Sequence, residues 1–160
     1  MKKEHDSAAD EETKLLAIIR DSFVERMPFN RILGIDVLSL HHEEAVCRFS
    51  MRPELVGNYV RNILHGGVTS AVLDVTGGLV AFLGVQRKMR GKSVDEILER
   101  FARIGTIDLR IDYLRPGQGE WFVARGFPLR TGNKVTVTRM ELFNDSEELI
   151  AVGTAAYTVS

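Results

Sequence analysis

The sequence predicts an α+β fold in which a curved antiparallel β-sheet wraps around one long central helix. Two observations predict it. Residues 67–83 form an apolar stretch of helical length, and four strand-like segments follow one another from Gly105 to the end of the chain. Runs of strands with separate helices are typical of α+β proteins rather than of alternating parallel folds. A helix that is apolar all round must be buried on several sides, and a sheet curved around it would achieve this.

The composition is that of an ordinary soluble domain. The chain has 160 residues, 44% hydrophobic and 27% charged, with a formal net charge of −1. We therefore interpret residues 1–160 as a single domain with a polar, flexible arm at about 1–9. The balanced charge argues against a nucleic-acid partner. Cys47 is the single cysteine, so no internal disulfide forms and a reducing compartment, the cytoplasm, is expected.

The first elements are a helix and a hairpin. Apolar residues fall at three- and four-residue steps from about Asp10 to Met27 and predict an amphipathic N-terminal helix that Pro28 ends. The apolar positions of this helix are Leu15, Leu16, Ile18, Ile19, Phe23 and Met27. Residues 35–39 and 45–51 then alternate with the period of two strands. The HHEE sequence between them, 41–44, is interpreted as a polar turn and not as a metal site.

The central helix is predicted over Gly67–Leu83. A membrane span is disfavoured because Asp74 lies near its middle, where a charge costs about 2.5–3.5 kcal/mol on insertion scales. After it, Ser93 and Glu96 have the spacing of a capping box and predict a short inserted helix.

The remaining chain is predicted to be strands. In GTIDLRIDYL, 105–114, apolar residues alternate strictly, with Ile107, Leu109, Ile111 and Tyr113 on one face. The RPGQGE segment is expected to turn the chain into three further strands, over 120–130, 134–143 and 148–159, which continue a meander through turn-forming Gly, Asn, Asp and Ser.

His65, Gly66 and Gly67 stand where the central helix begins. The first amides of a helix have no partner within it, and with the helix dipole they favour negative charge. Glycines leave these amides open to a substrate. A thioester carbonyl could be polarised there as in an oxyanion hole, where one donor is worth about 2.7–4 kcal/mol.

Asp74 lies seven residues beyond Gly67, on the same face of the helix. Seven rises of about 1.5 Å separate them by ~10 Å, which is too far for both to act on one carbonyl. If two chains pack these helices antiparallel, each Asp74 approaches the glycine turn of the other chain. The spacing therefore predicts a homodimer with two composite sites.

With these features the chain resembles the hotdog-fold acyl-CoA thioesterases of the PaaI type, and among them the bacterial YigI branch. The segments that carry the resemblance are MPFNRILGI, VGNYVRNILHGGVTSAVLDVTGGLV, IGTIDLRIDYLRPG and RTGNKVTV. They cover the chain from about residue 25 to its end. The HGG motif with an acid nine residues after the His is matched here without a gap.

The resemblance implies catalytic roles. The Gly66 N–H would bind the thioester carbonyl beside Gly67, His65 would shape the turn and orient the carbonyl, and Asp74 of the partner chain would be general base or nucleophile. Thr106 stands where relatives often carry a serine that positions the water. The family's polar residue six before the His is Tyr59 here. Asn58, reached by a one-residue bulge, is favoured for that role over Asn62.

The resemblance also implies where substrate binds. The CoA phosphates would meet Arg130 and Lys134 in the RTGNK turn with Gly132 and Asn133, or Arg115, and Tyr113 would help line a site for a medium or long acyl chain. No cofactor or metal is expected. The expected partners are an acyl-CoA and a second copy of the chain, with a tetramer as a further state, in fatty acid metabolism. No membrane partner is expected.

Two other functions compete with hydrolysis. A hotdog dehydratase or hydratase would need a catalytic His paired with an acid in another arrangement, and no second suitably placed His is found. A non-catalytic acyl-CoA-binding module would release no CoA. For Asp74 the structural alternative is a buried acid satisfied by hydrogen bonds, whereas Gly77 and Gly78 are interpreted as close-packing positions.

Overall fold

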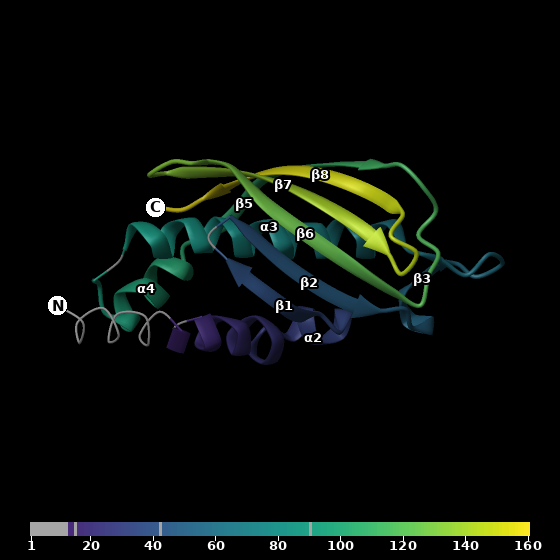
Figure 1. The fold of residues 1–160 in the computed structure, drawn as a ribbon, viewed down its shortest axis with the longest axis horizontal. Helices are drawn as coiled ribbons and strands as arrows, with labels where there is room; N and C mark the ends of the chain where they lie inside the picture. The colour runs from purple at the N-terminus through teal and green to yellow at the C-terminus, as the bar shows by residue number, and fades with distance from the viewer. Residues whose placement is uncertain (1–12, 15, 42, 90) are drawn as a thin grey trace.

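The computed structural model describes residues 13–14, 16–41, 43–89 and 91–160, and confirms the predicted sheet and central helix. Figure 1 shows the sheet lying over the long helix α3, with α4 beside the C-terminal end of that helix. In spatial order the antiparallel sheet contains β1 (Asp36–His41), β2 (Glu44–Ser50), β6 (Trp121–Thr131), β7 (Val135–Asn144), β8 (Leu149–Thr158) and β5 (Gly105–Tyr113).

Helix α3 is the centre of the core. It runs from Gly66 to Lys88, five residues beyond the predicted end, because Val85 and Gln86 are still buried and Lys88 bonds to the β6–β7 turn. By length and hydropathy α3 could cross a membrane, but 67% of its most apolar window is buried inside the protein. It is therefore the core helix of the fold, as predicted from Asp74.

The strand order departs from the predicted meander. β6, β7 and β8 are consecutive neighbours, but β5 pairs with β8 and not with β6. The prediction that RPGQGE makes a simple turn was therefore wrong. The segment from Leu114 to Glu120 instead crosses the end of the sheet, where the Leu64 N–H donates to the Gly117 carbonyl at 2.9 Å. This crossing places β5 at one edge of the sheet.

The strict alternation predicted for β5 also fails at its ends. Ile107 is 56% exposed and Tyr113 55% exposed, and the register with β8 shifts between Thr106 and Asp108. An edge strand has a neighbour on one side only, and a bulge re-aims its side chains. β5 therefore presents apolar groups outside the core of the single chain.

The N-terminal helical segment ends as predicted before Pro28. Residues 16–21 are helical and continue into a π-helical turn, η1 (Ser22–Arg26). Pro28 then begins a short helix, α2 (Pro28–Leu33), that was not predicted; Gly34 ends α2 at φ 68°. Proline is favoured at a first helical position, where no amide partner is lost. The predicted arm at 1–9 and the helix start at Asp10 lie outside the described residues.

Smaller elements complete the fold. The inserted helix α4 spans Val94–Phe101, and both hydrogen bonds of the predicted Ser93–Glu96 capping box are present. Phe101 packs edge-on against Phe82 of α3, with ring centroids 5.0 Å apart. The 3₁₀ turn η2 (Pro53–Leu55) and a two-stranded hairpin, β3 (Val56–Asn58) and β4 (Ile63–Leu64), were not predicted. This hairpin leads directly into α3.

Candidate active site

The start of α3 is organised by His65. His65 is the N-cap residue in an extended conformation, and its Nδ1 accepts the Gly67 N–H at 2.8 Å. The Gly67 amide of the predicted cradle is therefore already bonded within the chain. Across the described residues no acceptor contacts the Gly66 N–H. Of the two glycine amides predicted to bind a carbonyl, only the Gly66 N–H is therefore available within the described residues.

The β3–β4 hairpin fixes the place of His65. The His65 N–H donates to the Leu55 carbonyl at 2.9 Å. Gly57 of β3 also lies against His65: a Cβ added there would be 2.7 Å from the His65 Cα and 3.0 Å from its Cδ2. Only a residue without a side chain allows this approach. Gly57 was missed from the sequence because nothing local to β3 reports its contact with a residue eight positions later.

Tyr113 contacts the other side of the turn. Its hydroxyl donates to the Gly66 carbonyl at 2.9 Å, and Ser70 donates to the same oxygen at 3.2 Å. These bonds hold the peptide that follows Gly66. Tyr113 was predicted to help line the acyl site; in the chain it reaches the glycine turn while more than half of its surface stays exposed.

Asp74 is half-buried and held by two donors of its own chain. Its Oδ1 accepts the Thr106 hydroxyl at 2.9 Å and the Tyr157 hydroxyl at 3.1 Å. Tyr157 also contacts the Asp74 backbone carbonyl at 2.9 Å. Burial, followed by the nearby charge of Asp74, raises the pKa of Tyr157 far above its usual range. The phenol therefore stays protonated and acts as a donor.

Strand β5 spans both halves of this arrangement. Near its start Thr106 bonds to Asp74, and at its end Tyr113 bonds to Gly66. Because α3 is continuous from Gly66 to Lys88, Gly67 and Asp74 stay ~10 Å apart along its axis. The structure thus brings Thr106 to Asp74 and Tyr113 to the glycine turn, but it does not bring Asp74 to the turn of its own chain.

The predicted CoA-binding residues fall into two groups. Lys88, at the end of α3, donates to the carbonyls of Thr131 (3.0 Å) and Gly132 (2.7 Å). Its Nζ also bonds the Asn133 Oδ1 at 3.1 Å. The β6–β7 turn therefore lies ~33 Å along the helix from the glycine turn, by 22 rises of about 1.5 Å.

Arg130, at the end of β6, and Lys134, in the turn, are exposed. Arg115, by contrast, follows β5 near the glycine turn, and its Nη1 donates to the Leu149 carbonyl at 2.8 Å. The predicted substrate residues consequently do not form one site within a single chain.

The polar residues before His65 lie around the β3–β4 hairpin. The Asn58 Oδ1 accepts the Arg61 N–H at 3.2 Å and so supports the hairpin turn. The register of the hairpin shifts between Val56 and Asn58, before Asn58 and not between Asn58 and His65. Asn62 has a positive φ of 49°. In the described residues neither side chain has a hydrogen bond to His65 or Asp74.

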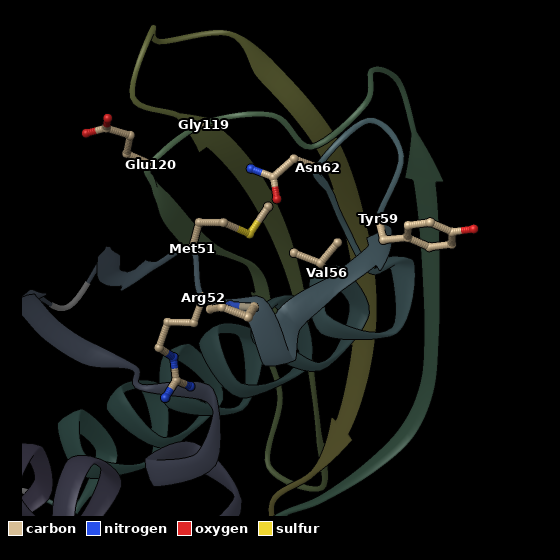
Figure 2. A pocket seen from close by; sticks show the side chains of 8 residues that line it. Met51, Arg52, Val56, Tyr59, Asn62, Gly119 and Glu120 are labelled. Atoms are coloured by element: carbon tan, nitrogen blue, oxygen red, sulfur yellow. The ribbon is translucent and has the colours of Figure 1, made fainter.

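A pocket of about 500 Å³ lies beside this hairpin (Figure 2). Asn62 and Met51 point into the same space, whereas Tyr59 points away from it. Arg52 turns toward α2, where its guanidinium bonds the Ile32 carbonyl. Asn62 is the one predicted candidate among the residues that line this pocket.

An antiparallel sheet curled around one buried helix is the hotdog arrangement, so the chain is a hotdog-fold protein. Residues 61–151 match the model of the thioesterase superfamily. The chain is 46% identical over 144 residues to the medium/long-chain acyl-CoA thioesterase YigI of Escherichia coli, covering 90% of this chain and 93% of that protein.

The corresponding YigI of Salmonella typhimurium is 45% identical over the same coverage. A crystal structure from Shewanella oneidensis, of a protein related to the thioesterase superfamily, is 42% identical with a TM-score of 0.88, covering 92% of this chain and 97% of that one. The chain belongs to the thioesterase superfamily and is a thioester hydrolase.

Proposed function

We propose that the protein hydrolyses medium- or long-chain acyl-CoA thioesters at composite sites formed by two copies of the chain. The observation that carries this proposal is the geometry of α3. In the described part of the chain the Gly66 N–H at its start has no acceptor, and Asp74 stands two turns along it, out of reach of that amide. The names of the YigI relatives support the choice of substrate.

In the proposed reaction the Gly66 N–H binds the thioester carbonyl and stabilises negative charge as it develops there. Asp74 of the partner subunit accepts a proton from water, whose oxygen attacks the carbonyl carbon. The C–S bond then breaks, the CoA sulfur takes up the proton, and the free acid leaves. In the alternative route Asp74 attacks the carbonyl itself, expelling CoA, and water then hydrolyses the mixed anhydride.

Strand β5 supports the proposed dimer. Within the described chain β5 pairs with β8 on one side only. The nine-residue edge of β5 offers a row of backbone groups to another chain, and Ile107 on this strand is largely exposed. A twofold axis at this edge would place the two α3 helices antiparallel. Pairing of dimers into a tetramer, a cytoplasmic location and a role in fatty acid metabolism belong to the same proposal.

An antiparallel dimer also accounts for the divided substrate residues. It would move the partner's β6–β7 turn toward this chain's glycine turn. Gly132 and Asn133 line a hollow of about 270 Å³ together with Lys88 and Arg100, which supplies positive charge suited to CoA phosphates. Arg130 and Lys134 would add to it. Arg115 is held by the Leu149 carbonyl and would bind phosphate only on giving up that bond.

Mixed dimers test the composite site. Asp74→Asn removes the proposed base or nucleophile. Gly66→Pro removes the proposed donor at a first helical position, where proline is tolerated. Each variant alone should release almost no CoA in a thiol assay.

When the two variants are unfolded together and reassembled at equal amounts, half of the dimers are mixed, and each mixed dimer holds one intact site. About a quarter of wild-type activity should return. A mixture as inactive as its components would contradict a site shared between chains.

Asp112→Asn is the matched control. Asp112 is an acid on β5 whose side chain is 49% exposed and pairs with Arg110. Its loss should leave activity within about twofold, since exposed ion pairs contribute little. If Asp74→Asn behaved like this control, Asp74 would have no catalytic role. Tight binding of acyl-CoA by the wild type without release of CoA would show a binding module instead.

A further inference from the structure

Tyr157 is hydrogen-bonded to Asp74 and was not singled out from the sequence. It lies on β8 and is 2% exposed. Its hydroxyl is 3.1 Å from the Asp74 Oδ1 and 2.9 Å from the Asp74 backbone carbonyl. One phenol therefore contacts both the carboxylate and the peptide that bears it.

The protein accommodates this hydroxyl at a cost. Phenylalanine would fill the same space in the core without burying a polar group, and a buried hydroxyl destabilises a fold unless it is hydrogen-bonded. A Cβ on Gly77 of α3 would collide with the Tyr157 hydroxyl and lie 2.8 Å from the Met140 Sδ. Glycine inside a helix costs about 1 kcal/mol relative to alanine. Helix α3 therefore has a glycine at the position that the Tyr157 hydroxyl contacts.

The two donors select one oxygen of the carboxylate. Thr106 and Tyr157 both donate to Oδ1, and no donor in the described residues bonds Oδ2. Thr106 approaches from the edge strand β5 and Tyr157 from β8, its neighbour. A carboxylate held through one oxygen from two strands cannot rotate freely about its bond to Cβ.

We propose that Tyr157 is a positioning residue that, with Thr106, fixes Asp74 through Oδ1 and leaves Oδ2 as the oxygen that takes the proton from water or attacks the thioester. This inference rests on the proposed catalytic role of Asp74. Thr106 accordingly acts on the carboxylate and not on the water. Tyr157 orients the carboxylate as a hydrogen-bond donor and does not itself exchange a proton in the reaction.

Tyr157→Phe tests the proposal. The variant keeps the ring and removes the hydroxyl. The substrate should still bind, but Oδ2 of Asp74 is no longer held in position for the reaction. We expect kcat for acyl-CoA hydrolysis to fall ~10- to 100-fold, the scale of a small misplacement at a reacting centre. KM should stay within about twofold. A merely structural role would instead lower the amount of folded protein and leave kcat per folded site unchanged.

Thr136→Val is the matched control. Thr136 pairs with Tyr157 across β7 and β8, and its buried hydroxyl has no partner in the described part of the chain. Removing it deletes a buried hydroxyl of the same neighbourhood without touching Asp74. Its kcat should remain at the wild-type value. An equal fall in kcat for both variants would overturn the proposal.

Two further measurements separate the possible failures. If Asp74→Asn keeps wild-type activity, the proposed function of Asp74 is wrong; if Asp74→Asn is inactive while Tyr157→Phe keeps wild-type kcat, only the present inference is wrong. Should Tyr157→Phe not fold, proton NMR of the wild type decides. The Tyr157 hydroxyl should give a slowly exchanging downfield resonance that shifts in Asp74→Asn, and its absence would contradict the hydrogen bond.

Discussion

Gly57→Ala tests how the β3–β4 hairpin positions the glycine turn. The added methyl would lie 2.7 Å from the His65 Cα and 3.1 Å from its Cβ. A clash with a backbone atom cannot be relieved by a side-chain rotation, so the hairpin or His65 must move. Overpacking of this kind costs about 1–3 kcal/mol, and the lower entropy of the unfolded chain returns about 0.4–1 kcal/mol. We expect a net loss of ~1–2 kcal/mol, a fall in Tm of roughly 2–8 °C.

The larger effect should be on activity. The Nδ1 of His65 accepts a hydrogen bond from the Gly67 N–H. If His65 is displaced, the Gly67 N–H moves with it, and so does the neighbouring Gly66 N–H at the helix start. Misplacement of the carbonyl site by up to ~1 Å should lower kcat/KM by ~10- to 100-fold. The assay is CoA release from a long-chain acyl-CoA, measured well below the Tm of the variant so that unfolding does not contribute.

Gly105→Ala is the matched control for this change. It adds the same methyl to another strand, where the nearest atom is the Thr158 Cγ2 at 3.4 Å. Its kcat/KM should stay within about twofold of the wild type. A Gly57→Ala protein that melts lower but retains wild-type kcat/KM would refute the idea that β3 positions the turn for catalysis.

Three further predictions concern two core residues and the C-terminal end of α3. Burial raises the pKa of Cys47 to about 11, so native protein at pH 8 should not react with a disulfide reagent, and rapid reaction before unfolding would contradict this. Lys88→Met removes three hydrogen bonds to the β6–β7 turn and should lower Tm by ~2–4 °C; an unchanged melting curve would show that the turn is stable without them. Folding raises the pKa of Tyr157 above its ordinary value of 10.0, so the stability that this phenol contributes is complete below pH 10 and lost above it. Between pH 9 and 11 the urea midpoint should therefore fall further in the wild type than in Tyr157→Phe, and parallel curves would contradict it.

The sequence predicted the elements whose evidence is local. The helix α3 is marked by its apolar length and by the HGG start, and α4 by the spacing of Ser93 and Glu96; both are present in the structure. The hairpin of β1 and β2 follows from alternation alone. In each case the residues that define the element are within a few positions of one another, so their pattern can be read along the chain.

The strand order was predicted less well because pairing is a long-range property. Alternation indicates that β5 is a strand but not that it pairs with β8, some 40 residues away. Two short strands, β3 and β4, contain three and two residues, too few for a period to be visible. This hairpin, which the sequence did not predict, is nevertheless the element that positions His65. One part of the site therefore rests on strands too short to show a pattern in the sequence.

For the same reason, the sequence predicts that Asp74 is important but not which residues orient its carboxylate. Asp74 is conspicuous in the sequence because it interrupts an apolar helix, and a charge at such a place requires partners. Its partners, Thr106 and Tyr157, come from strands 32 and 83 residues away, and neither is unusual in its own strand. The spacing of Asp74 from Gly67 predicts that the acid serves another chain. The contacts on Oδ1 add that its own chain holds the acid in place, so in the proposed dimer one subunit orients the carboxylate and the other presents the carbonyl.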